Sequence, residues 1–194
     1  MNLLFFLLSG ILGDIKAPEI KIIDERSKIY TGTDTVIIKL EDIIKYTGKI
    51  CPGICAGIRT TMVGLKAIYE QEIPKRGEIQ VAVPFRGEFA NVISYITGTR
   101  FEHSTILVDT TLVQDTVVSY IFGRKGGKTV KVTLNEVKIH SHHKNFTLET
   151  FTQFLKDMLN GKRDEIYTIE DIEYVFPEEK AHMHKHIHED EDKE

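Results

Sequence analysis

The two cysteines of the chain lie four residues apart, where the strongest helical pattern begins. Pro52 follows Cys51, and proline is tolerated in the first turn of a helix, where its missing N–H would have no partner. We therefore expect Cys51 at the N-terminus of a helix, where unpaired amides and the positive end of the helix dipole favour an anionic sulfur. A thiolate is the form of cysteine that binds metals and attacks electrophiles.

Cys55 follows one helical turn after Cys51, on the same face of the expected helix. The pair is suited to a shared divalent metal ion, or to a redox couple in which Cys55 resolves an oxidised Cys51. The alternative is a structural role, because free cysteine is among the most often buried residue types. This alternative applies more to Cys55 than to Cys51. Small residues that fit a tight helix contact surround the pair: Gly53, Ala56, Gly57 and Gly64.

Histidines are the other candidate ligands, and most of the eight stand in two clusters. Alternating histidines near the C-terminus would present imidazoles on one side of an extended segment, and acidic residues follow them. Short tracts of this kind bind zinc, nickel or copper loosely. The alternative is a solvated tail that binds nothing. One cluster is His140, His142 and His143, and the other, the tail histidines, is His182, His184, His186 and His188.

Hydrophobic periodicity predicts an α+β fold with the core order α-β-α-β-β-β, preceded by strands and followed by a C-terminal helix. Apolar residues recur at three- and four-residue steps from Ile54 to Leu65, which is typical of an amphipathic helix. A glycine-rich loop at 123–127 predicts a hairpin. Helices are expected at 41–46, 52–70, 88–96 and 148–159, strands at 19–24, 34–40, 78–84, 104–109, 115–122 and 128–134, and a helical turn or extended chain at 168–175.

Three stretches share a pattern with a known family. The first, at 42–53, ends in Cys-Pro-Gly; the second is Ile-Thr-Gly-Thr at 96–99; and the third is the hairpin at 122–130. Together, over about residues 40 to 136, they resemble the FmdE domain, which belongs to a subunit family of formylmethanofuran dehydrogenase. The resemblance implies helices packed on one face of a mixed sheet, in agreement with the order that periodicity predicts.

The resemblance also implies a metal site at the Cys-Pro-Gly segment, with zinc as the expected divalent ion. The family usually has His-Gly-His-x-Cys-Pro-Gly at this place. Thr47 and Lys49 stand where the family has histidines, and Thr99 stands where it often has cysteine. Cys51 is then the ligand that this chain retains.

The turn at 97–103 is expected to lie close to Cys51, because the corresponding turn does so in the family. His103 follows this turn and is a candidate replacement ligand; the alternative is a surface residue with a hydrogen-bonding role. Arg59 and Arg100 are candidates to hold an anion near the cysteine. For Arg59 we expect instead an ion pair with a carboxylate.

Composition narrows the classes of partner. The 194 residues carry a formal charge of −4 with scattered Lys and Arg, which argues against a nucleic-acid surface. Two cysteines are not a disulfide framework, so reduced or metal-bound thiols are expected. The apolar run at 3–12 is shorter than the roughly 20 residues that span a bilayer. Because no basic residue precedes it, we expect a packed segment or oligomer contact and a cytoplasmic protein, with an atypical export signal as the alternative.

We expect four regions: an N-terminal extension at 1–40, the core domain at 41–136, a helical extension at 137–176 and a flexible tail at 177–194. Three functions fit them. The first is a metal-binding accessory or regulatory protein, with a tight site at Cys51 and weaker sites on the tail histidines. The second is a cysteine-based redox protein or enzyme, and the third is a domain used only for protein association. A homodimer is expected, and the resemblance also implies membership of a larger redox complex.

Overall fold

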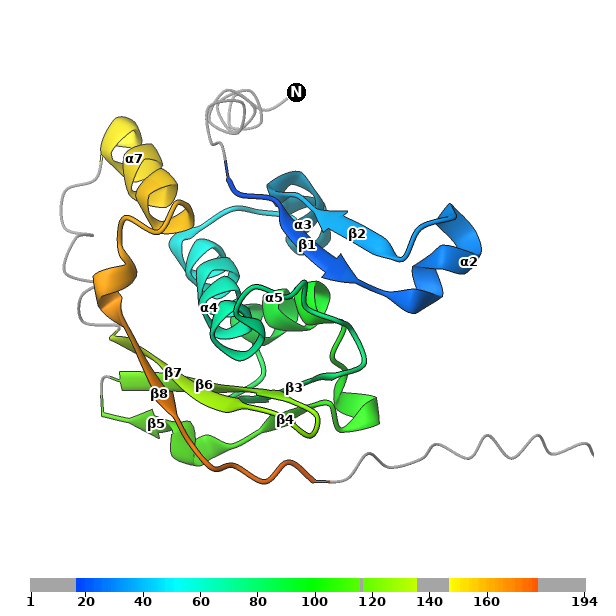
Figure 1. Ribbon diagram of the computed structural model, residues 1–194. Coiled ribbons are helices and arrows are strands. Elements are labelled where there is room, and N and C mark those ends of the chain that lie inside the picture. Colours follow the sequence, from blue (N-terminus) through cyan, green and yellow to red (C-terminus); the bar gives the residue numbers. More distant parts are fainter. Residues whose placement is uncertain (1–16, 116, 136–146, 178–194) are drawn as a thin grey trace, which may run out of the picture.

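A computed structural model describes residues 17–115, 117–135 and 147–177 of the chain (Figure 1). Its centre is a six-stranded mixed sheet in the order β4-β3-β6-β7-β8, with the two-residue β5 paired to β6. β3 and β4 are parallel, and the other pairs are antiparallel. The predicted α+β class is therefore confirmed. The strands are β3 (Ile79–Val83), β4 (Ile106–Val108), β5 (Val113–Gln114), β6 (Val117–Arg124), β7 (Thr129–Asn135) and β8 (Tyr167–Asp171).

Two helices, α4 (Pro52–Tyr69) and α5 (Glu88–Thr97), lie together on one face of the sheet (Figure 1). Side chains alternate between the two faces of a strand, so Val81 of β3 and Phe122 of β6 point into the core beneath α4. Gly64 lets α4 approach the sheet, because a Cβ at this position would collide with the ring of Phe122. The close contact between α4 and the sheet fixes the height of the N-terminal end of α4.

An N-terminal hairpin packs beside these helices. It consists of β1 (Ile20–Ile23), a 3-10 turn η1 (Glu25–Ser27), α2 (Lys28–Thr31) and β2 (Thr35–Ile38), and it continues into α3 (Leu40–Thr47). Two backbone hydrogen bonds tie it to the body of the protein: the Ile23 amide donates to the Pro74 carbonyl at 2.8 Å, and the Arg76 amide donates to the Ile23 carbonyl at 2.8 Å. Asp24 therefore lies beside Arg76.

The C-terminal part of the described chain completes the same core. Helix α7 (Leu148–Leu159) packs against α4, and β8 joins the sheet beside β7. Leu155 and Leu159 belong to the same buried cluster as the residues of α4. The region that we expected as a helical extension therefore shares the core of the preceding region.

An extended segment after β8, the C-terminal strap (172–176), covers the second face of the sheet (Figure 1). Its alternate side chains turn inward and pack against a small apolar cluster on that face. The expectation of a helical turn or extended chain at 168–175 is thus resolved as a strand followed by extended chain. The inward residues are Ile172, Tyr174 and Phe176, and the cluster is Ala82, Leu112 and Ile121.

No helix within the described segments combines the length and the apolar character needed to cross a membrane.

Candidate metal centre

Cys51 is the N-cap residue of α4, with extended backbone angles of φ −154° and ψ 167°. Its carbonyl accepts the Cys55 amide at 3.0 Å, which closes the first turn, and Pro52 occupies a position where no amide is required. The predicted place of Cys51 at the start of this helix is confirmed. Its side chain is half-buried, so its sulfur remains accessible.

A carboxylate from a distant part of the chain meets this sulfur. The Sγ of Cys51 lies 3.9 Å from Oε2 of Glu88, the first residue of α5. The other oxygen of Glu88 is paired with the ammonium of Lys49. This hydrogen bond is the main cause that raises the pKa of Lys49 above its ordinary value. A thiol, a carboxylate and an ammonium group therefore meet at one place.

The N-termini of α4 and α5 lie at the same end of the helix pair. A Cβ on Gly53 would stand 3.9 Å from Phe89, and a Cβ on Gly57 would stand 3.5 Å from Val92, so the two helices run side by side in the same direction. Both positive dipole ends are thus close to Cys51. Such ends stabilise anionic groups, here a thiolate and the Glu88 carboxylate.

Cys55 has a different environment. Its side chain is fully buried in the core cluster, and this burial, with a smaller effect from Cys51, raises the pKa of the Cys55 thiol far above its ordinary value. A thiol that stays protonated is a weak ligand and a slow nucleophile. The structure therefore places Cys55 as a packing residue behind Cys51.

His103 lies in another part of the molecule. It ends the 3-10 turn η2 (Phe101–His103) beyond the C-terminus of α5 and lines a cavity with Arg76 and Arg100. Glu88 stands at the opposite end of α5, a helix of ten residues or about 15 Å. The structure thus places the 97–103 turn apart from Cys51. Within the described segments no three His, Cys, Asp or Glu side chains gather as a metal-binding group.

Of the two arginines considered as anion ligands, Arg59 forms an ion pair, as expected. Its Nε donates to Oδ1 of Asp164 at 2.8 Å, and its second nitrogen bonds the other oxygen, so α4 is clamped to the turn before β8. Arg100 lines the same cavity as His103 and is therefore not beside Cys51. The expectation for Arg100 was wrong about its location, because the turn that carries it leaves the far end of α5.

The remaining candidates, both histidine clusters, lie outside the described residues, as does the apolar run at 3–12. They are His140, His142 and His143, and His182, His184, His186 and His188. Sequence reasoning missed Glu88. The sequence indicates only a helix start there, since no local signal ties this residue to a cysteine 37 residues earlier.

No protein-family model matches the chain, and no curated protein matches it. Among solved structures, the chain is similar to a tungsten formylmethanofuran dehydrogenase FmdE-like protein from Syntrophus aciditrophicus. The TM-score is 0.50 at 17% sequence identity, and the alignment covers 70% of this chain and 71% of that chain. At this identity the similarity concerns the fold alone. The chain is thus a remote structural relative of that protein.

Proposed function

We propose that this chain is a metal-binding accessory or regulatory protein, that its ion is divalent, with zinc first, and that Cys51 and Glu88 are the ligands. The observation that carries the proposal is the 3.9 Å separation between Cys51 Sγ and Glu88 Oε2. In a tetrahedral zinc site, with Zn–S of about 2.3 Å and Zn–O of about 2.1 Å, these two ligand atoms stand about 3.6 Å apart. A shift of a few tenths of an ångström brings the pair to that distance.

The charges around the pair support an exchangeable ion. A thiolate and a carboxylate together balance the charge of a divalent cation, and the two helix N-termini stabilise both anions. Lys49 now neutralises Glu88, so an incoming metal must displace an ammonium group. Two protein ligands leave the other two positions of a tetrahedral ion to water or to a group from a partner. An accessory or regulatory role suits such an open site better than a closed structural site does.

The structural neighbour is described as an FmdE-like protein of a tungsten formylmethanofuran dehydrogenase. By analogy, the proposal includes membership of a larger redox complex and a homodimeric state. It also includes a reducing compartment such as the cytoplasm, because the metal-binding form of Cys51 requires a free thiol, and both cysteines are free.

The redox alternative has less support from the geometry. A resolving cysteine must ionise to attack an oxidised partner, whereas burial raises the pKa of the Cys55 thiol. Cys51 therefore lacks an accessible resolving thiol on its own helix.

Elemental analysis of the full chain, purified without added metal and then titrated with zinc, tests the proposal. We expect about one tightly held ion per chain. Cys51→Ser should abolish this tight binding, and Glu88→Gln should weaken it by at least about tenfold, since losing even an outer partner of a metal ligand costs about 10- to 100-fold. Glu41→Gln, which removes an exposed carboxylate from α3, is the charge-matched control and should bind zinc like the parent.

Two further variants separate the competing ligands. Cys55→Ala should keep the tight ion, and loss of zinc from this variant would contradict the pairing of Cys51 with Glu88. Truncation after Pro177 removes the tail histidines and should remove only weak binding. If Cys51→Ser binds zinc as tightly as the parent, the proposed site is wrong.

A further inference from the structure

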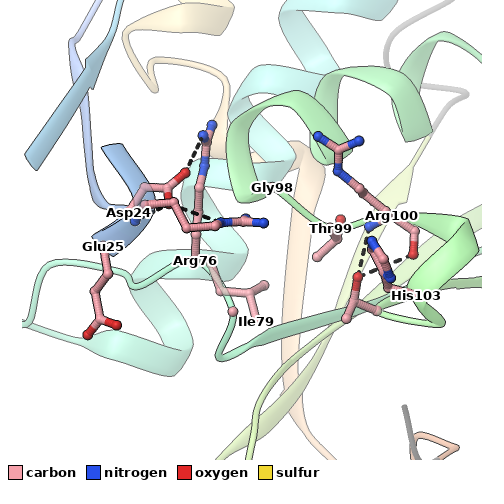
Figure 2. Close-up of a pocket in the computed structure, with 11 residues that line it drawn as sticks. Asp24, Glu25, Arg76, Ile79, Gly98, Thr99, Arg100 and His103 are labelled. Atoms are coloured by element: carbon pink, nitrogen blue, oxygen red, sulfur yellow. Dashed lines mark hydrogen bonds and ion pairs between the residues drawn. The ribbon is translucent and has the colours of Figure 1, made fainter. Parts of the chain in front are cut away.

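A separate cavity of about 410 Å³ opens at the C-terminal end of α5 (Figure 2). This volume lies in the range of small-molecule sites, roughly 300–1,000 Å³. Asp24, Glu25 and Arg76 stand on one side, and Thr99, Arg100 and His103 stand on the other. Three arginines and two carboxylates line it, which leaves a charge of +1 with His103 neutral. The whole chain has a charge of −4, so the cavity is a positive region on an acidic protein.

Both carboxylates of the lining are already engaged. Asp24 accepts Arg76 NH1 at 3.2 Å and lies 3.5 Å from Nε of Arg26, and Glu25 is paired with Lys75 at 2.7 Å. Arg76 is engaged too, because its other nitrogens donate to the last carbonyls of α5, those of Tyr95 and Ile96. The acidic groups at this end of the cavity are therefore neutralised by the protein itself.

Arg100 differs from these groups. Its exposed guanidinium has no carboxylate partner among the residues that the structure describes. A guanidinium presents its N–H groups in a planar fork that matches the oxygens of a carboxylate or phosphate. Arg100 is thus the cation of this cavity that remains open to an external anion.

The loop that carries Arg100 is held rigidly. The Arg100 carbonyl accepts the amides of His103, Thr105 and Ile106 at 3.2–3.4 Å, and it also accepts the Thr105 hydroxyl at 3.2 Å. The Arg100 amide in turn donates to the same hydroxyl at 2.8 Å. A charged group on a loop that is already ordered loses little entropy when a ligand binds.

We infer that this cavity binds a small oxyanion, a phosphate- or carboxylate-bearing molecule, with Arg100 as its principal ligand and His103 and Arg26 at the rim. The site stands at the far end of α5 from Cys51 and Glu88, and it does not depend on a metal there. Both the charge and the volume of the cavity suit a small metabolite rather than a macromolecule.

Isothermal titration calorimetry of the full chain with inorganic phosphate, and separately with malonate, tests this inference at constant ionic strength. We expect saturable binding of at least one of the two anions. Arg100→Gln should weaken that binding by about tenfold, the worth of one charge-assisted hydrogen bond. Lys45→Gln removes the same charge from an exposed position on α3 and should leave the affinity unchanged.

Backbone NMR of the parent gives a test that needs no variant. Phosphate or malonate should shift the amides of 98–105 and 24–26 and leave those around Cys51 unmoved. The inference is overturned if neither anion binds saturably, if Arg100→Gln binds as the parent does, or if the shifts concentrate elsewhere. The metal proposal survives each of these outcomes, because its own variants alter a different end of α5.

Discussion

Tyr174 and Asp109 fasten the C-terminal strap to the sheet by one hydrogen bond between side chains. The Tyr174 hydroxyl donates to Oδ2 of Asp109 at 2.9 Å. Burial, and then this bond to a carboxylate, raise the pKa of Tyr174 to about 12. The pKa of Asp109 is lowered, chiefly by the hydrogen bond from Thr111, so the carboxylate that accepts the bond is ionised at neutral pH. The strap is therefore held by the protonated tyrosine.

Tyr174→Phe should lower the free energy of unfolding by about 1 kcal/mol at pH 7, because it removes the hydrogen bond and keeps the ring. The folded-state pKa of Tyr174 lies above the unfolded value of about 10, so the stabilisation is complete below pH 10 and is lost as the pH rises towards 12. Urea unfolding of parent and variant between pH 7 and 11 should show the difference shrinking. Tyr30→Phe, at a residue that is 87% exposed, is the control and should change nothing.

Single residues also show where sequence reasoning succeeds. The place of Cys51 was predictable because Pro52 and the following helical pattern are local signals. Glu88 was not, because only the packing of α5 beside α4 brings it to the sulfur. The same packing carries Arg100 to the opposite end of α5, away from the site that the sequence suggested.

At the scale of elements, the contact between α4 and β6 depends on one missing side chain. Gly64 faces the buried ring of Phe122, and a Cβ would collide with it, whereas Gly57 faces Val92 at an ordinary 3.5 Å. The two glycines stand two turns apart on the same helix, so they form a matched pair.

Gly64→Ala should reduce the free energy of unfolding by about 1–3 kcal/mol, the usual cost of overpacking a core. Gly57→Ala should be neutral or stabilising by up to about 1 kcal/mol, since alanine favours the helix over glycine by this amount. Chemical denaturation of both variants measures the contrast. Equal stability of the two variants would mean that α4 does not rest on Phe122 as the structure shows.

Elements with a strong local period were predictable. The amphipathic pattern at 52–70 corresponds to α4 within one residue, and the Gly-rich loop at 123–127 joins β6 to β7. Sheet order was less accessible, because strand pairing joins segments far apart in the sequence. Thus β8 pairs with β7 across the segment that includes α7, and no local pattern marks that partnership.

At the scale of the whole molecule, the second face of the sheet is covered by the chain itself. Phe176 packs over Gly123, which has no side chain to prevent it, and the strap closes the apolar cluster around Ile121. The expectation of a dimer had rested partly on an open sheet face or edge. That argument now applies to other surfaces.

The exposed apolar surface that remains most prominent is on the N-terminal hairpin. Ile29 and Tyr30, both on α2, are 80% and 87% exposed, and Ile37 on β2 is 46% exposed. Neighbouring apolar residues on a protruding element are typical of a contact with another chain. The homodimer that we propose would bury these side chains.

Multi-angle light scattering at micromolar concentration should therefore give twice the chain mass of 22.2 kDa. The double variant Ile29→Ser and Tyr30→Ser should shift the protein to the monomer, because each substitution removes apolar area that only the dimer buries. Val175→Ser is the matched control, since Val175 is 92% exposed on the outer side of the strap and should leave the mass unchanged. A parent that scatters as a monomer would end the dimer proposal, whereas a double variant that stays dimeric would move the interface away from α2 to another surface.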